Sequence, residues 1–247
     1  MSGKSYDKQF YDDHVDESLR SARIVLRRLW EYVQPASVLD VGCGRGAWLM
    51  ACRELGSTTL IGLDGKWNDQ SEMIDSAIQF RSTDLDQTFT VDRRTDLVIS
   101  LEVAEHLKPS SAGQFVDYLC QASDAVLFSA AYTGQGGTHH LNEQPHSYWA
   151  HLFRNRGYMP FDLFRPVLWG NEDVRFWYQQ NTFLYCKEGS IPFDTIKGKG
   201  CCELSNVRFM DCIHPSLYEM RRRSIGLRFR QNISGVISTV QRRLLHR

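Results

Sequence analysis

Four residues at alternate positions follow an apolar run near the N-terminal end of the chain. Residues 38–49 have the sequence VLDVGCGRGAWL, which places Asp40, Gly42, Gly44 and Gly46 in one turn. Backbone groups at glycines can lie close to a nucleotide-like ligand that a side chain would block. Dinucleotide sites bind a pyrophosphate with the pattern G-x-G-x-x-G, and its third glycine is missing here. The turn therefore predicts a site for a nucleotide-like cofactor without a pyrophosphate.

Two more carboxylates follow the next two predicted strands. Asp64 lies in LIGLDG, 18 residues beyond Gly46, where it could accept hydrogen bonds from both hydroxyls of a ribose. Asp84 lies in QFRSTDL, at a position from which it could bind an adenine amino group. An acid after a strand is often only a turn residue. The three motifs in this order nevertheless favour an adenosine-containing cofactor.

A second group of residues could move a proton. Glu102, Glu105 and His106 follow a predicted strand at positions i, i+3 and i+4, which share one face of a helical turn. His139 and His140 lie in a long loop, 131–143, and long loops in compact domains are often functional. Two carboxylates and two imidazoles suit Mg²⁺ or Mn²⁺. The alternatives are a general base without a metal, at His106 or His140, and a purely structural role.

The elements that must position these residues alternate along the chain. We expect strands at 37–41, 58–63, 78–82, 96–101, 124–130, 160–164 and 181–186, and helices at 18–33, 45–55, 110–121 and 145–156. This alternation predicts a mostly parallel sheet with helices on both faces. We expect four regions: a helical segment or lid over 1–34, a cofactor-binding domain over 35–190, an irregular extension over 191–218 and a basic amphipathic helix over 219–247.

The motifs VLDVGCGRG, IGLDG, STDLD and DLVISLEVAEHL resemble those of class I S-adenosylmethionine (SAM) dependent methyltransferases over residues 35–190. The resemblance implies a Rossmann-like α/β sheet of seven strands, the last antiparallel, and SAM as cofactor. It also implies cofactor-binding roles for eight residues: Asp40, Gly42, Gly44, Gly46, Asp64, Asp84, Leu85 and Leu101. The family often has a bulky residue after the ribose-binding acid, whereas this chain has Gly65 there and Trp67 two positions further on.

The segment E-x-x-E-H also resembles the metal-binding segment of small-RNA 2′-O-methyltransferases and ubiquinone-pathway O-methyltransferases. Their loop pattern His-x-Asn-Glu matches His140, Asn142 and Glu143. The resemblance implies that Mg²⁺ or Mn²⁺ would be bound by Glu102, Glu105, His106 and His140. The catalytic candidates are His106, His140 and Glu105.

Residues 134–149, GQGGTHHLNEQPHSYW, are similar to a bacterial methyltransferase subgroup associated with glycan and polysaccharide assembly. We therefore expect O-methylation of a hydroxyl on a sugar, a glycan or a related small metabolite. Tyr148 and Trp149 would form part of an acceptor wall or pack in the core, and residues 165–181 could line the same cleft. An aromatic or quinone hydroxyl and an RNA 2′-hydroxyl are alternative acceptors. An inactive SAM-binding assembly module, recruited through the basic tail, is an alternative of another class.

Charge is unevenly distributed along the 247 residues. The net charge is zero, but residues 219–247 carry eight arginines and one acid, so the rest of the chain is acidic, which argues against nucleic acid as a partner. The basic tail could bind an anionic membrane surface or a second copy of the chain. Seven cysteines without a C-x-x-C pair, and the lack of a long apolar run, favour a cytoplasmic protein, which the tail could hold peripherally at the inner membrane face. Tyr6, Phe10, Tyr11 and His14 precede the first expected helix and could close over the cofactor.

Overall fold

The structure is a computed structural model, which describes residues 8–87 and 93–223, with side chains from residue 15 onward. The chain divides after Cys212 into two units, of which the second spans 213–247. Only residues 213–223 of that second unit are described, and 215–223 of them are helical. The expected tail over 219–247 therefore lies mostly outside the described residues.

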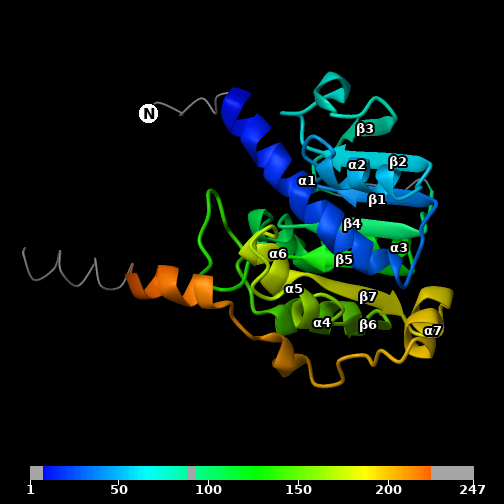
Figure 1. Cartoon of the computed structure of the whole chain (residues 1–247), viewed down its shortest axis with the longest axis vertical. Coiled ribbons are helices and arrows are strands. Elements are labelled where there is room, and N and C mark those ends of the chain that lie inside the picture. The colour runs from blue at the N-terminus through cyan, green and yellow to red at the C-terminus, as the bar shows by residue number, and fades with distance from the viewer. Residues whose placement is uncertain (1–7, 88–92, 224–247) are drawn as a thin grey trace, which may run out of the picture. The chain divides into compact units, whose positions relative to one another are not determined.

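A sheet of seven strands forms the centre of the first unit (Figure 1), in the order β3-β2-β1-β4-β5-β7-β6. The strands are β1 (Ser37–Val41), β2 (Thr59–Asp64), β3 (Ile78–Ser82), β4 (Leu97–Leu101), β5 (Ala125–Ser129), β6 (Tyr158–Phe161) and β7 (Phe183–Lys187). Neighbouring strands are parallel except that β7 runs antiparallel to both β5 and β6. The Rossmann-like α/β fold with an antiparallel last strand is confirmed.

Helices cover both faces of this sheet because its strands are apolar on both sides. Leu97 and Ile99 of β4 belong to one core, whereas Val98 belongs to the other. The first core includes α1 (Lys8–Trp30), α2 (Ala47–Glu54), α5 (Arg165–Leu168), α6 (Phe176–Asn181) and α7 (Ile191–Gly198); the second includes α3 (Ala112–Ala122), α4 (His146–Arg154) and the 3₁₀ turn η4 (Val207–Met210). Figure 1 shows α1 crossing in front of the strands.

Four 3₁₀ turns complete the described elements, and three of them lie at the strand ends: η1 (Gln70–Glu72), η2 (Ala104–His106) and η3 (Pro109–Ser111). The seven cysteines are free thiols. In the part of the chain that the structure describes, no helix is both long enough and apolar enough to span a membrane.

Three expected elements differ from those observed. The helix expected at 18–33 begins at Lys8 and ends at Trp30. The strand expected at 160–164 is β6, at Tyr158–Phe161, and it includes Pro160 because β6 is an edge strand, where a missing backbone N–H is tolerated. The extension 191–218 is not wholly irregular, since α7 begins with Pro192 in its first turn and buries Phe193 and Ile196. Eight residues are too few to show a clear helical period.

Candidate active site

The glycine turn after β1 has an unusual backbone. Gly42, Gly44 and Gly46 have φ values of 86°, 53° and 87°, a left-handed region that favours glycine. A Cβ at Gly42 would lie 2.3 Å from Val103 Cγ2, and one at Gly46 would lie 2.4 Å from Ile78 Cδ1, whereas a Cβ at Gly44 would meet nothing within 4 Å. Gly42 and Gly46 are therefore required by internal packing. The expectation that side chains at these positions would block a ligand stays a prediction.

Asp64 ties the end of β2 to this turn. Its carboxylate accepts hydrogen bonds from the backbone N–H groups of Gly44 and Gly65, both at 2.6 Å. Asp40 is buried behind the turn, and its Oδ2 has no hydrogen-bond partner among the described residues. Burial, and then the charge of Asp64, raises the pKa of Asp40 well above its ordinary value. The predicted contact of Asp40 with the cofactor stays a prediction.

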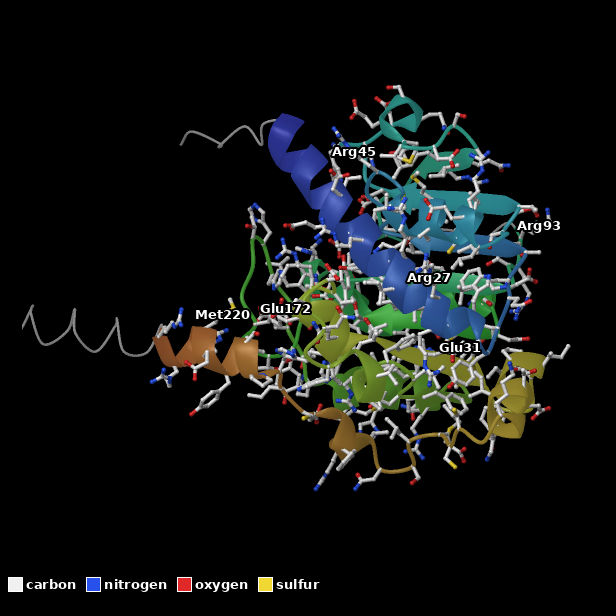
Figure 2. The ribbon with its side chains drawn as sticks, in the orientation of Figure 1. Arg27, Glu31, Arg45, Arg93, Glu172 and Met220 are labelled. Carbon is white, nitrogen blue, oxygen red and sulfur yellow. The ribbon has the colours of Figure 1, made fainter. Side chains whose placement is uncertain are left out.

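A pocket of about 420 Å³ opens over the turn. It is lined by residues of the turn, of α1, α2 and α6, of the end of β4 and of the segment after β2: Val15, Ser18, Gly42, Cys43, Gly44, Arg45, Ala47, Trp48, Trp67, Asn68, Asp69, Glu72, Leu101 and Tyr178. Arg45 forms an ion pair with Glu72 at 2.7 Å and lies beside the N-terminal half of α1 (Figure 2). The predicted residues Gly42, Gly44 and Leu101 are thus brought together around one cavity.

The N-terminal segment contributes to this pocket in a different way from that expected. Phe10, Tyr11 and His14 lie within α1 and do not precede it, and their side chains are outside the described residues, as is Tyr6. Val15 and Ser18, one helical turn apart on α1, line the pocket. The lid function of the preceding residues stays a prediction.

The ring of Trp67 fills the space beside Gly65, the position at which the family often has a bulky side chain. A Cβ at Gly65 would lie 2.2 to 2.4 Å from three ring atoms of Trp67. Burial raises the pKa of Asp64, and Trp67 is among the groups that oppose the rise, although its side chain is 81% exposed. The glycine at 65 therefore allows Trp67 to lie against the backbone beside Asp64, on the wall of the pocket.

Asp84 and Leu85 are not among the residues that line the pocket. The Asp84 carboxylate accepts a hydrogen bond from the backbone N–H of Asp86 at 3.1 Å and so stabilises a turn. Leu85 is half-buried and packs against the second core. Their predicted contacts with adenine stay predictions.

The three residues predicted to be catalytic form a cluster beyond β4, on what we call the acceptor side of the site. Glu105, His106 and His140 each offer one ligand atom, and these atoms lie within 4.8 Å of one another. The His106 and His140 rings meet edge to face, with centroids 4.9 Å apart. Glu105 is buried, its Oε2 has no partner among the described residues, and burial raises its pKa well above the ordinary value. Loss of hydration, and then His140, lowers the pKa of His106.

The loop 131–143 is held in shape by Glu143. Its Oε2 accepts the N–H of Gly134 at 2.7 Å, and its Oε1 accepts the N–H of Gly136 at 2.6 Å and contacts His140 Nδ1 at 2.8 Å. Gly137 makes room for the ring, since a Cβ there would lie 2.2 Å from His140 Nε2. His139, with φ of 60°, is exposed at the bend of the loop. The carboxylate therefore orients His140 toward His106.

Glu102, the fourth predicted metal ligand, is not part of the cluster. Its Oε2 accepts a hydrogen bond from Gln135 Nε2 at 2.9 Å and its Oε1 one from Asn181 Nδ2 at 3.0 Å. Sequence reasoning included Asn181 only in the segment 165–181 that could line the cleft; it did not single the residue out, because Asn181 lies 79 positions away in α6 and no local pattern marks it. It also missed Arg45 and Glu72, which line the cofactor pocket.

The expected aromatic wall lies mostly in the core. Trp149 is buried and packs against Phe128 at a centroid distance of 5.3 Å, and His146 is buried as well. Tyr148 is half-buried and packs at the edge of the same core. In residues 165–181, Trp169 is partly exposed, and Trp177 packs against the first core. The core interpretation is thus confirmed for Trp149.

Comparison with known proteins places the chain in a family. A model described as "Methyltransferase domain" matches residues 11–162, which is more than half of the chain. The chain therefore belongs to this family of methyltransferases.

A curated relative and two solved structures are similar. The malonyl-[acyl-carrier protein] O-methyltransferase of Pseudescherichia vulneris is 33% identical over 93 residues, and the match spans 37% of each chain. Magnesium protoporphyrin IX methyltransferase from Synechocystis PCC 6803, solved with bound SAM, superposes with a TM-score of 0.51 at 16% identity, over 76% of this chain and 87% of that one. An O-methyltransferase family protein from Burkholderia thailandensis has a TM-score of 0.51 at 12% identity, over 75% and 61%. At these identities the two structures show the fold alone.

Proposed function

We propose that the chain transfers a methyl group from SAM to an oxygen atom of a small acceptor. The observation that carries the proposal is the pocket over the glycine turn, with Asp64 fixed at the end of β2. Gly44 leaves the floor of the pocket open, and the Asp64 carboxylate is a hydrogen-bond acceptor of the kind that binds ribose hydroxyls. The family match to a methyltransferase domain supports SAM as donor.

The reaction needs little from the protein beyond position and one proton acceptor. The acceptor oxygen attacks the methyl carbon, the carbon–sulfur bond breaks, and sulfur keeps the electron pair. The hydroxyl proton must leave, and His106 is the proposed base. Because the pKa of His106 is lowered below its ordinary 6.5, the ring is neutral and able to accept a proton near neutral pH. His140, oriented by Glu143, and the buried Glu105 complete the proposed catalytic group.

Calorimetry tests the donor and kinetics test the base. SAM and its demethylated product S-adenosylhomocysteine (SAH) should both bind with dissociation constants in about the micromolar range. Failure of the chain to bind either ligand would remove SAM from the proposal. His106→Asn should lower kcat by about 10² to 10⁴ while SAM still binds. Full turnover by that variant would show that His106 is not the base.

A metal-assisted reaction is the second candidate, and the cluster of Glu105, His106 and His140 favours it. The residues fit a divalent ion in part: they supply three donors, and one of them is a buried carboxylate oxygen without a partner among the described residues. Glu102 is bound to two amides and does not join them. A bound Mg²⁺ or Mn²⁺ would lower the pKa of an acceptor hydroxyl. Full activity after chelation, and full activity of His140→Ala on the same acceptor, would exclude the metal.

The acceptor class is proposed from the loop 131–143 and the residues after it. We infer a sugar, a glycan or a related small metabolite with adjacent hydroxyls. Support comes from the similarity of residues 134–149 to glycan-associated methyltransferases; the Pseudescherichia vulneris and Synechocystis proteins above are named for other acceptors. A panel of nucleotide sugars, glycans and phenols, assayed with radiolabelled SAM, tests this inference. Labelling of phenols alone would contradict it.

The basic tail is proposed to bind an anionic membrane surface or a second copy of the chain. Residues 224–247 lie outside the described residues, so the support is the sequence alone: eight arginines and one acid over 219–247. Flotation with anionic vesicles at low and high salt, compared with a chain that ends at residue 216, tests the first partner. Sedimentation of the same two chains tests the second.

A further inference from the structure

A buried group of polar side chains lies behind Glu102, and the proposed reaction does not use it. The group comprises Asn181 and Gln180 at the end of α6 and His146 at the start of α4, and all three are at most 2% exposed. Gln135 connects the group to the loop 131–143. Buried polar groups are costly unless they are hydrogen-bonded, so a cluster of this size requires an explanation.

The hydrogen bonds fix which way the Asn181 amide faces. Its Nδ2 donates to Glu102 Oε1 at 3.0 Å and to Gln135 Oε1 at 2.9 Å. Its Oδ1 accepts from Gln180 Nε2 at 2.8 Å and faces His146 Nε2 at 2.9 Å. If the amide were turned over, its oxygen would face the Glu102 carboxylate, and its nitrogen would face the Gln180 donor. Asn181 therefore has one orientation that satisfies all its partners.

His146 supports that orientation from behind. Both of its ring nitrogens face acceptor oxygens, Nε2 that of the Asn181 amide and Nδ1 that of the Met210 carbonyl, so a neutral ring can donate to one of them at a time. Burial lowers the pKa of His146, and its contacts with Asn181 and Met210 oppose that change. Its Nδ1 lies 2.9 Å from the Met210 carbonyl oxygen, which also accepts from Arg165 Nη1 at 2.7 Å. The imidazole is thus held between η4 and Asn181.

Glu102 lies next to residues that line the cofactor pocket, so its charge could affect a bound ligand. It follows Leu101, and its partner Asn181 lies one helical turn after Tyr178 on α6; Leu101 and Tyr178 both line the cofactor pocket. Its backbone has φ of 56°, a costly conformation for a residue with a side chain, and such conformations cluster at functional sites. Burial raises the pKa of Glu102, and hydrogen bonds from Asn181, Ser129 and Gln135 oppose that rise.

We propose that Asn181, supported by His146 and Gln180, is a positioning residue that holds the Glu102 carboxylate as a fixed negative charge beside the cofactor pocket. The inference rests on the proposed function, in which SAM is the donor. SAM carries a positive sulfonium, whereas SAH is a neutral thioether at the same sulfur. A fixed carboxylate nearby should therefore stabilise bound SAM relative to bound SAH, and so favour exchange of product for fresh donor.

Calorimetric titration of the full chain with SAM and with SAH tests the inference. Asn181→Leu should weaken SAM binding by about tenfold while SAH binding changes by less than about twofold. His146→Gln should change the ratio of the two affinities in the same direction by a smaller factor, because glutamine can still donate to Asn181. His151→Gln is the matched control, since His151 lies on the same helix and is exposed; its ratio should be that of the wild type.

A double-mutant cycle separates the charge from a general loss of structure. Glu102→Gln should lower the preference for SAM as much as Asn181→Leu does, and the two changes together should lower it no further. Equal weakening of SAM and SAH in Asn181→Leu would mean that Asn181 only maintains the fold of the pocket. An unchanged ratio in Asn181→Leu and His146→Gln would also overturn the inference. Failure of the wild-type chain to bind either ligand would instead overturn the proposed function on which it rests.

Discussion

The cofactor side and the acceptor side of the site are built by contacts of different range. On the cofactor side, five residues of one turn place three glycines, and Asp64 reaches that turn from the adjacent strand. On the acceptor side, Glu102 is fixed by Gln135 and Asn181, which are 33 and 79 positions away. The turn is thus specified by local backbone conformation, whereas the acceptor side depends on how loops and helices pack together.

This difference predicts that a glycine-to-alanine substitution will have different effects on the two sides. On the cofactor side the backbone is enclosed by core residues, so a clash there must strain the fold. On the acceptor side the loop 131–143 is held by its own hydrogen bonds, so a clash there should displace one side chain and leave the fold intact.

The largest effect is expected for Gly46→Ala. The new Cβ would lie 2.4 Å from Ile78 Cδ1 in a backbone with φ of 87°, so packing and conformation both oppose it. We expect a loss of about 3 kcal/mol in the free energy of unfolding, with loss of SAM binding. Urea denaturation measures the first and calorimetry the second.

Gly113→Ala is the matched control for Gly46→Ala. Gly113 lies in α3, and the nearest atom to its Cβ would be Arg156 Nη2 at 3.8 Å. Alanine in an unobstructed helix should raise the free energy of unfolding by about 0.5 to 1 kcal/mol. If Gly46→Ala were as stable as the wild type, the turn would not be the rigid part of the site.

The second effect is expected for Gly137→Ala in the acceptor loop. Its Cβ would lie 2.2 Å from His140 Nε2, so the ring must move away from His106. We expect kcat to fall by about 10- to 100-fold, while stability and SAM affinity stay near those of the wild type. Thr138→Ala, an exposed neighbour in the same loop, is the control and should keep full turnover. A fall in SAM affinity equal to the fall in kcat would show that the two sides are not separable.

The third effect is a pH dependence that distinguishes the two acceptor-side mechanisms. A neutral His106 is required for proton transfer, so kcat/KM should rise as pH increases through its pKa. That pKa is lowered by loss of hydration and by His140, so the acid limb should lie below pH 6.5. His106→Asn should abolish this limb in the residual activity. If the limb instead moves when the metal ion is changed, a metal-bound hydroxyl is the titrating group.

The contrast between the two sides also explains what the sequence could predict. The strand bounds were predicted to within three residues, because alternating apolar segments and turns are local signals. The glycines and Asp64 were predicted for the same reason. Asn181 and the Gln135 contact could not be predicted, since they depend on where α6 and the loop lie after folding. The separation of Glu102 from Glu105 and His106 was missed because η2 is a single 3₁₀ turn and Glu102 precedes it in a left-handed conformation.

The smallest effect is expected at Trp67, which lies on the surface of the cofactor side. Its ring lies against Gly65, next to Asp64, and lines the pocket, so a ligand that occupies the pocket must change the surroundings of the ring. We expect SAM to alter the tryptophan fluorescence of the wild type, and Trp67→Phe to lose most of that signal while SAM affinity falls by about two- to fivefold. Trp169 is partly exposed and does not line the pocket, so Trp169→Phe should keep both the fluorescence response and the SAM affinity of the wild type. A full fluorescence response in Trp67→Phe would place the adenosine of SAM away from Trp67 and Asp64. The cofactor side would then resemble the acceptor side in depending on contacts that the turn does not specify.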